Sequence, residues 1–357
     1  MDASRHVGAL GALAALAAGC GGEDEEEQGS RSYDERHPPS PPARSPKKGS
    51  AKGEQGRAPS RKRGPALAVI GDTPYSPVQV ADFRDDIASI NSDPDVRLAI
   101  HLGDIQAERR CEDRYLARIR RDFDTFADPL VYTPGDNEWT DCHPESRGGH
   151  APTERLAKLR SVFFDRPGHT LGRRPKKVKA QRAPFVENVR WEQYRTVFLT
   201  LHVVGSDNGR EPWSAAAGRA QQVEENRARM RANLGWLDRG FAAARDRRAA
   251  AVVVALQADM WPEGGPGQAS GFDPIVARLA RLARAFRGPV LVLDGDSHEF
   301  KSDRPLARGS PIHGVATRAP NVTRIVVQGE DTDEYLRLQV DHRAPAVFSW
   351  ERVPFEG

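Results

Sequence analysis

The chain has 357 residues, with 53 lysines and arginines against 50 aspartates and glutamates and a formal net charge of +3. Residues 1–65 hold 11 of the basic and 9 of the acidic side chains, which leaves 42 basic and 41 acidic ones for residues 66–357. This near balance argues against nucleic-acid binding through bulk positive charge, and the length allows one large domain or two small ones.

The N-terminus has the pattern of a targeting segment. Arg5 precedes an apolar run over residues 7–18, which is too short to span a bilayer as a helix but has the length of a signal-peptide core. The run ends in Leu16-Ala17-Ala18-Gly19-Cys20, which resembles a bacterial lipobox with Cys20 as the acylated residue. The alternative is a plain secretory signal with an incidental cysteine. Both predict a mature chain outside the cytoplasm, and the lipobox predicts anchoring to a bacterial membrane through Cys20.

Residues 21–65 are predicted to form a disordered, low-complexity tether. They contain an acidic run over residues 23–27, then a proline-rich stretch over residues 38–42 and a basic stretch over residues 44–63. Such a composition cannot bury enough apolar surface to offset the loss of chain entropy. We therefore expect a signal peptide over residues 1–20, the tether over residues 21–65 and one folded domain over residues 66–357.

From residue 66 onward, strand-like apolar runs alternate with helical periodicity. Apolar stripes predict helices that carry the buried positions Val80/Phe83/Ile87/Ile90, Tyr115/Ile119/Phe123/Phe126, Leu156/Leu159/Phe163, Val223/Met230/Leu234/Leu237/Phe241 and Ile275/Leu279/Leu282/Phe286. Strands are predicted at 66–70, 97–102, 130–133, 196–204, 251–256 and 289–293, and the tail segments 322–327, 335–340 and 346–350 are predicted to be antiparallel strands closing a sheet. This alternation indicates a layered α/β fold.

Four of the predicted strands end in the same kind of polar sequence. Gly71-Asp72, Gly103-Asp104, Gly135-Asp136-Asn137-Glu138 and Gly295-Asp296-Ser297-His298 each follow an apolar run. Ligands bind beyond the carboxyl ends of strands in open α/β sheets, and several carboxylates cannot stay ionised together without a cation. A single Gly-Asp is most simply a turn or a helix cap, but the set with His298 predicts a metal site.

Two cysteines follow these strand ends. Cys111 lies seven residues after Asp104, and Cys142 lies six residues after Asp136. An oxidising compartment outside the cytoplasm permits a disulfide between them, which would tie the two loops together at the site. The alternative is two buried free thiols.

The order of these blocks, with the polar residue Gln257 at the end of the strand over residues 251–256, resembles the calcineurin-like metallophosphoesterases, which include the purple acid phosphatases. The resemblance spans about residues 66–341. It implies a four-layer α/β/β/α sandwich of mixed sheets and a two-metal centre that hydrolyses phosphate esters.

The resemblance also assigns individual ligands. Asp72 matches the first-block ligand, Asp104 the carboxylate that bridges both metals, and His298 the last histidine of the fifth block. Asp136 stands in place of a ligand asparagine, whereas Gln257 and Asp296 stand in place of ligand histidines, and Pro74 replaces a further one.

Asn137 stands in place of the histidine that stabilises the reacting phosphate or protonates the leaving group. His101 and Glu138 are candidates for the missing proton transfer; the alternative is that each is only a polar residue without that role. The Ser206-Asp207-Asn208 turn lies at the same sheet edge if the strand before it is parallel, where it contacts substrate or is only a turn.

Two functional interpretations follow. In the first, one or two ions of Mn, Mg, Ca or Fe, favoured over Zn by the oxygen-rich ligand set, support hydrolysis of a phosphorylated small molecule or polymer. In the second, a surface lipoprotein uses a degenerate, non-catalytic metallophosphoesterase scaffold for binding.

Overall fold

The computed structural model describes residues 64–107, 111–214, 218–263, 267, 269–330 and 333–356. The predicted signal peptide, the predicted lipidation site at Cys20 and nearly all of the predicted tether lie outside the described residues. Residues 60–357 belong to one compact unit. Within the described residues, no helix is both long and apolar enough to cross a membrane.

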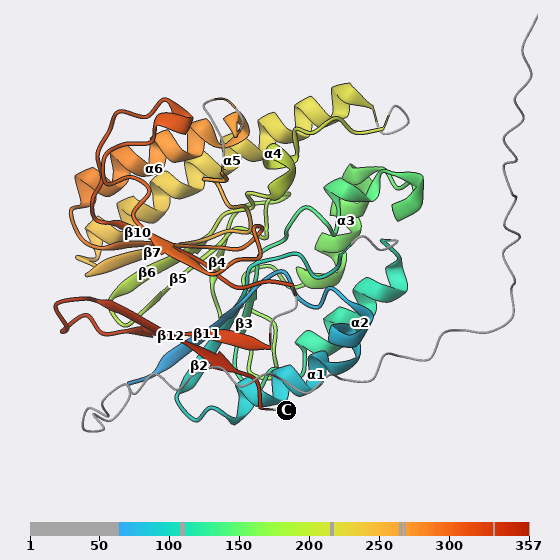
Figure 1. Ribbon diagram of the computed structural model, residues 1–357, viewed down its shortest axis with the longest axis horizontal. Helices are drawn as coiled ribbons and strands as arrows, with labels where there is room; N and C mark the ends of the chain where they lie inside the picture. The colour runs from blue at the N-terminus through green and yellow to red at the C-terminus, as the bar shows by residue number, and fades with distance from the viewer. Residues whose placement is uncertain are drawn as a thin grey trace, which may run out of the picture. The chain divides into compact units, whose positions relative to one another are not determined.

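The first sheet has five strands in the order β12-β11-β1-β2-β3 (Figure 1). The bounds are β1 Ala66–Ile70, β2 Val96–His101, β3 Leu130–Tyr132, β11 Glu334–Val340 and β12 Phe348–Pro354. Strands β1, β2 and β3 run parallel, whereas β11 is antiparallel to β1 and β12 is antiparallel to β11. The carboxyl ends of β1, β2 and β3 therefore open onto one edge, where Asp72, Asp104 and Asp136 follow.

The second sheet has seven strands in the order β4-β5-β6-β7-β8-β10-β9. The bounds are β4 Lys179–Ala180, β5 Val189–Gln193, β6 Thr196–Thr200, β7 Ala251–Ala255, β8 Val290–Asp294, β9 Lys301–Asp303 and β10 Val322–Val326. Strands β6, β7, β8 and β10 run parallel to one another. At one side β5 is antiparallel to β6 and β4 to β5, and at the other side β9 is antiparallel to β10.

One predicted strand belongs to a different sheet than expected. The tail segments were predicted to close one antiparallel sheet, and β11 and β12 do pair in this way. However, β10 joins the second sheet parallel to β8, with Val322 opposite Val290. Strand β8 is apolar on both faces up to Asp294, as in a parallel strand covered on two sides, whereas β10 carries Thr323 and the buried Arg324 among its apolar residues. Sequence proximity to β11 carried no information about the partner of β10.

The helices are α1 Pro77–Ser92, α2 Asp113–Phe123, α3 Pro152–Phe163, α5 Arg219–Asp246 and α6 Asp273–Phe286, with short 3₁₀ turns η1 Thr140–Cys142, η2 Glu145–Arg147, η4 Ser270–Phe272 and η5 Pro311–His313. Helix α1 begins at a capping box, in which Ser76 Oγ accepts the N–H of Gln79 at 3.1 Å and the Gln79 side chain accepts the N–H of Ser76. Val223 departs from its predicted core stripe and is 42% exposed.

The core contains three main apolar clusters. One joins α1, α2 and α3 to the first sheet through residues such as Phe83, Phe123 and Phe163. A second contains residues of both sheets, including Ile100 and Leu291, and a third joins α5 and α6 to the second sheet. Figure 1 shows α1 and α2 beside the first sheet and α5 and α6 beside the second. The fold is therefore mixed α/β with two mixed sheets.

Candidate metal centre

Four residues that follow strands at the site have left-handed backbone conformations. Asp72, Asp104, Asp296 and His298 have φ of 52°, 53°, 72° and 59°. Non-glycine residues adopt this region at a cost of about 1–2 kcal/mol each, and such strain collects at functional sites. The sequence places each of them within three residues after a glycine, so the chain turns sharply as it leaves the sheet.

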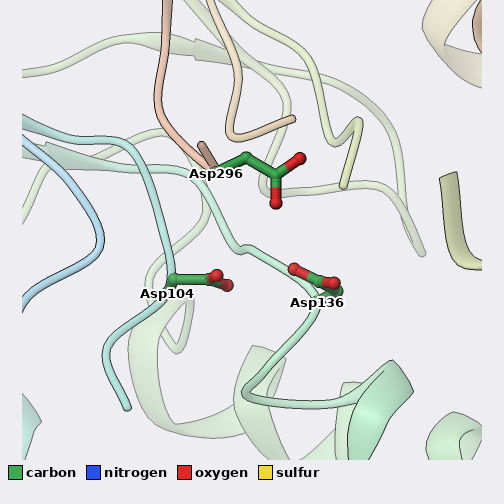
Figure 2. A group of neighbouring side chains, drawn as sticks. All are labelled: Asp104, Asp136 and Asp296. Carbon is green, nitrogen blue, oxygen red and sulfur yellow. The ribbon is translucent and has the colours of Figure 1, made fainter. Parts of the chain in front are cut away.

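Three of the predicted ligands converge. Asp104, Asp136 and Asp296 each offer one carboxylate oxygen, and these oxygens all lie within 4.8 Å of one another (Figure 2). Asp104 and Asp136 follow β2 and β3 of the first sheet, whereas Asp296 follows β8 of the second. Asp136 Oδ1 is buried with no hydrogen-bond partner among the described residues. A buried orphan oxygen within a carboxylate group fits a cation ligand.

The electrostatics of the three carboxylates also favour a cation. Burial, followed by repulsion from Asp136, Glu138 and the other acids, raises the pKa of Asp104 well above its usual range. Burial and the charges of Asp141 and Asp296 do the same for Asp136. The pKa of Asp296 rises to about 7 through burial and then the charge of Asp72. A bound cation would favour the ionised forms that these surroundings oppose.

Asp72 and His298 lie beside this group rather than within it. The Asp72 carboxylate is buried and accepts the backbone N–H of Asp296 at 3.0 and 3.1 Å. His298 Nε2 is 3.6 Å from Asp72 Oδ1, and His298 Nδ1 is 3.1 Å from Glu330 Oε2. Burial alone would lower the pKa of His298, but the carboxylates of Asp72 and Glu330 outweigh it and raise that pKa.

Gln257 turns its amide nitrogen, not its oxygen, toward the acids. Gln257 Nε2 donates to Asp104 Oδ2 and to Asp296 Oδ1, both at 3.1 Å. Gln257 Oε1 accepts the N–H of Gly205 at 2.7 Å. In this arrangement Gln257 bridges two carboxylates as a donor, so it would need to turn its amide over to serve as the predicted metal ligand.

Asn137 belongs to the rim of a cavity of about 370 Å³. Its amide donates to Tyr75 Oη at 2.7 Å and to Asp104 Oδ2 at 3.2 Å, and Tyr75 Oη itself donates to Asp104 Oδ2 at 2.8 Å. Arg147 Nη1 donates to Asn137 Oδ1 at 3.4 Å. The cavity is lined by Tyr75, Asp104, Asp136, Asn137, Arg147, Asp296, His298 and Glu330, together with Ala107.

The other two candidates for proton transfer do not line this cavity. Glu138 is fully buried, and its Oε1 accepts from the Tyr132 hydroxyl at 2.6 Å and from the N–H groups of Gly135 and Asp104. His101 is also fully buried, with Nε2 2.8 Å from the carbonyl oxygen of Thr73, and burial lowers its pKa to about 4. Both side chains therefore contact the strand ends beneath the cavity, and their proposed part in proton transfer stays a prediction.

The predicted cysteine pair is present. Cys111 and Cys142 lie at disulfide-bonding distance, with their Cα atoms 5.8 Å apart and both side chains buried. The backbone N–H of Cys111 donates to the carbonyl oxygen of Arg147 at 3.0 Å. The pair thus joins the loop after β2 to the segment that carries Arg147.

The turn after β6 also contacts the site. Because β6 is parallel to β7, Gly205–Gly209 (α4) lies at the same sheet edge. Ser206, Asp207 and Asn208 are all left-handed, and Ser206 Oγ donates to Asp136 Oδ2 at 2.7 Å. The position of Gly205 admits no side chain, because a Cβ there would lie 2.6 Å from Asp296 Oδ1.

Sequence reasoning missed two residues on the rim. Arg147 and Glu330 come from connections with no apolar pattern, so nothing in the local sequence marked them. Gly205 and Gly209, on either side of the Ser206-Asp207-Asn208 turn, were the signal in the sequence that this segment approaches other atoms closely.

Comparisons with known proteins add little to this geometry. No protein-family model and no curated protein matches the chain. Among solved structures the chain is similar to GAP50, the anchor in the inner membrane complex of Plasmodium, with 10% sequence identity and a TM-score of 0.43 over 83% of this chain and 90% of that one. A structural similarity this weak supports no conclusion about the family or function of the chain.

Proposed function

We propose that this chain is a metal-dependent hydrolase of phosphate esters, acting on a phosphomonoester or phosphodiester. The observation that carries the proposal is the group of Asp104, Asp136 and Asp296, whose carboxylate oxygens converge within 4.8 Å. The three would hold one divalent cation, and the adjacent pair of Asp72 and His298 would complete a second position. The oxygen-rich set favours Mn, Mg, Ca or Fe over Zn.

Such a cation, when bound, would polarise a phosphoryl oxygen and lower the pKa of a bound water. The residues around it have separate tasks. Arg147 presents a guanidinium at the rim of the cavity, suited to bind phosphoryl oxygens. Asn137 donates hydrogen bonds and would orient the phosphate. His298 lines the cavity, where the carboxylates of Asp72 and Glu330 raise its pKa and so favour its protonated form when no cation occupies the second position.

The domain that carries this site is proposed to be a four-layer α/β/β/α sandwich of the calcineurin-like type. Three apolar clusters support this layering, since one lies between helices and the first sheet, one between the sheets and one between the second sheet and helices. If the chain is a divergent member of that class, Gln257 and Asp296 are substitutions at positions where the class has histidine ligands.

Metal content and hydrolysis test the function together. We expect the purified chain to bind Mn²⁺ stoichiometrically and to hydrolyse p-nitrophenyl phosphate or bis(p-nitrophenyl) phosphate. Asp104→Asn should lower activity at least 100-fold, because it removes the carboxylate that faces both other ligands, while the protein stays folded by circular dichroism. Asp246→Asn, at an exposed position at the end of α5, is the matched control and should retain full activity. A folded wild-type chain with neither metal nor activity would overturn the proposal.

The competing function is a non-catalytic binding scaffold. One observation favours it: Gln257 Nε2 donates to both Asp104 and Asp296, so an amide already bridges two of the three carboxylates. The metal measurement separates the two, since a scaffold of this kind would retain its fold and its Gln257 contacts without Mn²⁺.

We also propose export and anchoring through Cys20 to a bacterial membrane. The support is the sequence Leu16 to Cys20 alone. Expressed in a bacterial host, the wild-type chain should fractionate with membranes and Cys20→Ser should be released into the soluble fraction. Membrane retention of Cys20→Ser would argue against the lipid anchor.

A further inference from the structure

A second hollow lies between α5 and the start of α6. It has a volume of about 460 Å³, within the range of small-molecule sites, and shares no lining residue with the carboxylate cavity. Arg219, Val223, Arg227 and Arg231 line it from α5, and their spacing of four residues puts neighbouring members on one helix face. Arg210 lies opposite, after the left-handed turn.

The charge of this groove is one-sided. Its lining, taken over the described residues, includes four arginines and no carboxylate. Arg210 is 3.5 Å from Asp207, and Arg231 is 3.8 Å from Glu224, in pairs that are largely exposed and therefore weak.

Two of these arginines have no carboxylate partner among the described residues. Arg219 donates to neutral acceptors, the Gln222 Oε1 at 2.6 Å and the carbonyl oxygen of Arg210 at 3.3 Å. Arg227 makes no ion pair with a described residue and is exposed. Both side chains are exposed and therefore accessible to an anion, and a guanidinium group can bind two phosphate oxygens at once.

Part of the lining of the groove is apolar. Val223 is 42% exposed, and among the large hydrophobic side chains of the described residues only Val78 is also exposed. Met230 and Pro274 lie in the same lining. A bare inorganic anion would leave these side chains in water, whereas a ligand with an apolar body would cover them.

The walls are held rigidly in place. Asn226 Nδ2 donates to the carbonyl oxygen of Asn208 at 2.8 Å, and the N–H of Gly271 donates to Asp207 Oδ1 at 2.7 Å. Gln222 Nε2 donates to the carbonyl oxygen of Gly209 at 2.9 Å. These bonds fix α5 and η4 to the left-handed turn, so the groove exists before a ligand arrives.

We propose that this groove binds an organic anion that carries two or more phosphate groups on an apolar or aromatic body. The arginines of α5 and Arg210 hold the phosphate chain, and Val223, Met230 and Pro274 cover the body. The proposal is independent of the metal centre and of the proposed hydrolysis.

The test uses ATP and inorganic tripolyphosphate as probes of the full chain in excess chelator, which removes any contribution of a metal at the carboxylates. Isothermal titration should show saturable binding of ATP, with tripolyphosphate at least threefold weaker. Arg219→Gln with Arg227→Gln should weaken both probes at least 10-fold. Val223→Ser should weaken ATP and leave tripolyphosphate unchanged.

The matched control is Arg245→Gln with Arg284→Gln. It removes the same charge from exposed positions of α5 and α6, the two helices beside the groove, but outside the groove lining. This control should change affinity less than twofold. The proposal is overturned by absence of saturable ATP binding to the wild type, by equal weakening in both double variants, or by a Val223→Ser effect that is the same for both probes.

Discussion

The half-buried carboxylate of Asp296 makes the stability of the metal-free fold depend on pH. Its pKa is about 7 in the folded chain against an ordinary 3.8, so the folded state binds more protons than the unfolded state between these values. The free energy of unfolding is therefore highest, as far as this group is concerned, below about pH 4, and it falls as the pH rises to 7.

Asp296→Asn should remove this dependence. In chelator, the variant should gain stability relative to the wild type between pH 4.5 and 7.5, by at most on the order of 4 kcal/mol. Urea unfolding at the two pH values measures the difference. Asp246→Asn, exposed at the end of α5, should give a curve parallel to that of the wild type. If Asp296→Asn also runs parallel to the wild type, Asp296 does not retain its proton in the folded chain.

At the scale of elements, the left-handed turn after β6 sets the shape of the carboxylate group. Three consecutive left-handed residues are held from α5, where the fully buried Arg229 donates to the side-chain and backbone oxygens of Asn208 at 2.5 and 2.9 Å. These hydrogen bonds offset the backbone strain of the turn. The turn also places Gly205 against Asp136 and Asp296.

Gly205→Ala should therefore damage the metal site with little effect elsewhere. The added Cβ would lie 2.6 Å from Asp296 Oδ1 and 2.7 Å from Asp136 Oδ2, so both carboxylates must move. We expect at least a 10-fold loss of Mn²⁺ affinity, about 1.4 kcal/mol, by isothermal titration.

The control for this change is Gly235→Ala within α5. There the nearest atom to an added Cβ is the end of the Arg239 side chain at 3.3 Å, so alanine should stabilise the helix by about 0.5–1 kcal/mol and leave Mn²⁺ affinity unchanged. Equal Mn²⁺ affinity in Gly205→Ala and the wild type would show that the turn does not shape the site.

Some features of these elements follow from the local sequence pattern, and others depend on partners far away in the chain. The ends of β2, β3 and β8 could be predicted because an apolar run stopped at an aspartate, and parallel strands bring such ends to one edge. The sheet that receives β10 could not be predicted, because the mixed sequence of Val322 to Val326 does not mark its partner strand.

At single positions the missing information was burial and orientation. His101 follows the β-strand pattern of a site residue, yet it is packed beneath the strand ends with its ring 5.0 Å from that of Phe123. Gln257 lies where a ligand was predicted, but which end of its amide faces the acids depends on the N–H of Gly205, 52 residues away in sequence. Long-range partners of this kind leave no periodic signal.

At the scale of the whole molecule, the carboxylate group connects the two sheets. Asp104 and Asp136 follow strands of the first sheet and Asp296 follows a strand of the second, so a cation held by all three would link both halves of the fold. Because the unfolded chain cannot gather these residues, binding would stabilise the whole domain. The gain is about 2.7 kcal/mol when the free cation is at 100 times its Kd.

Thermal unfolding should report this link. Added Mn²⁺ should raise the Tm of the wild type by several degrees over the same protein in chelator, since about 1 kcal/mol corresponds to roughly 2–4 °C for a domain of this size class. Asp104→Asn should show less than a quarter of this shift at equal ionic strength, because only two carboxylates remain. An equal shift in both proteins would place the cation elsewhere, and the two sheets would then be held together by their shared apolar cluster alone.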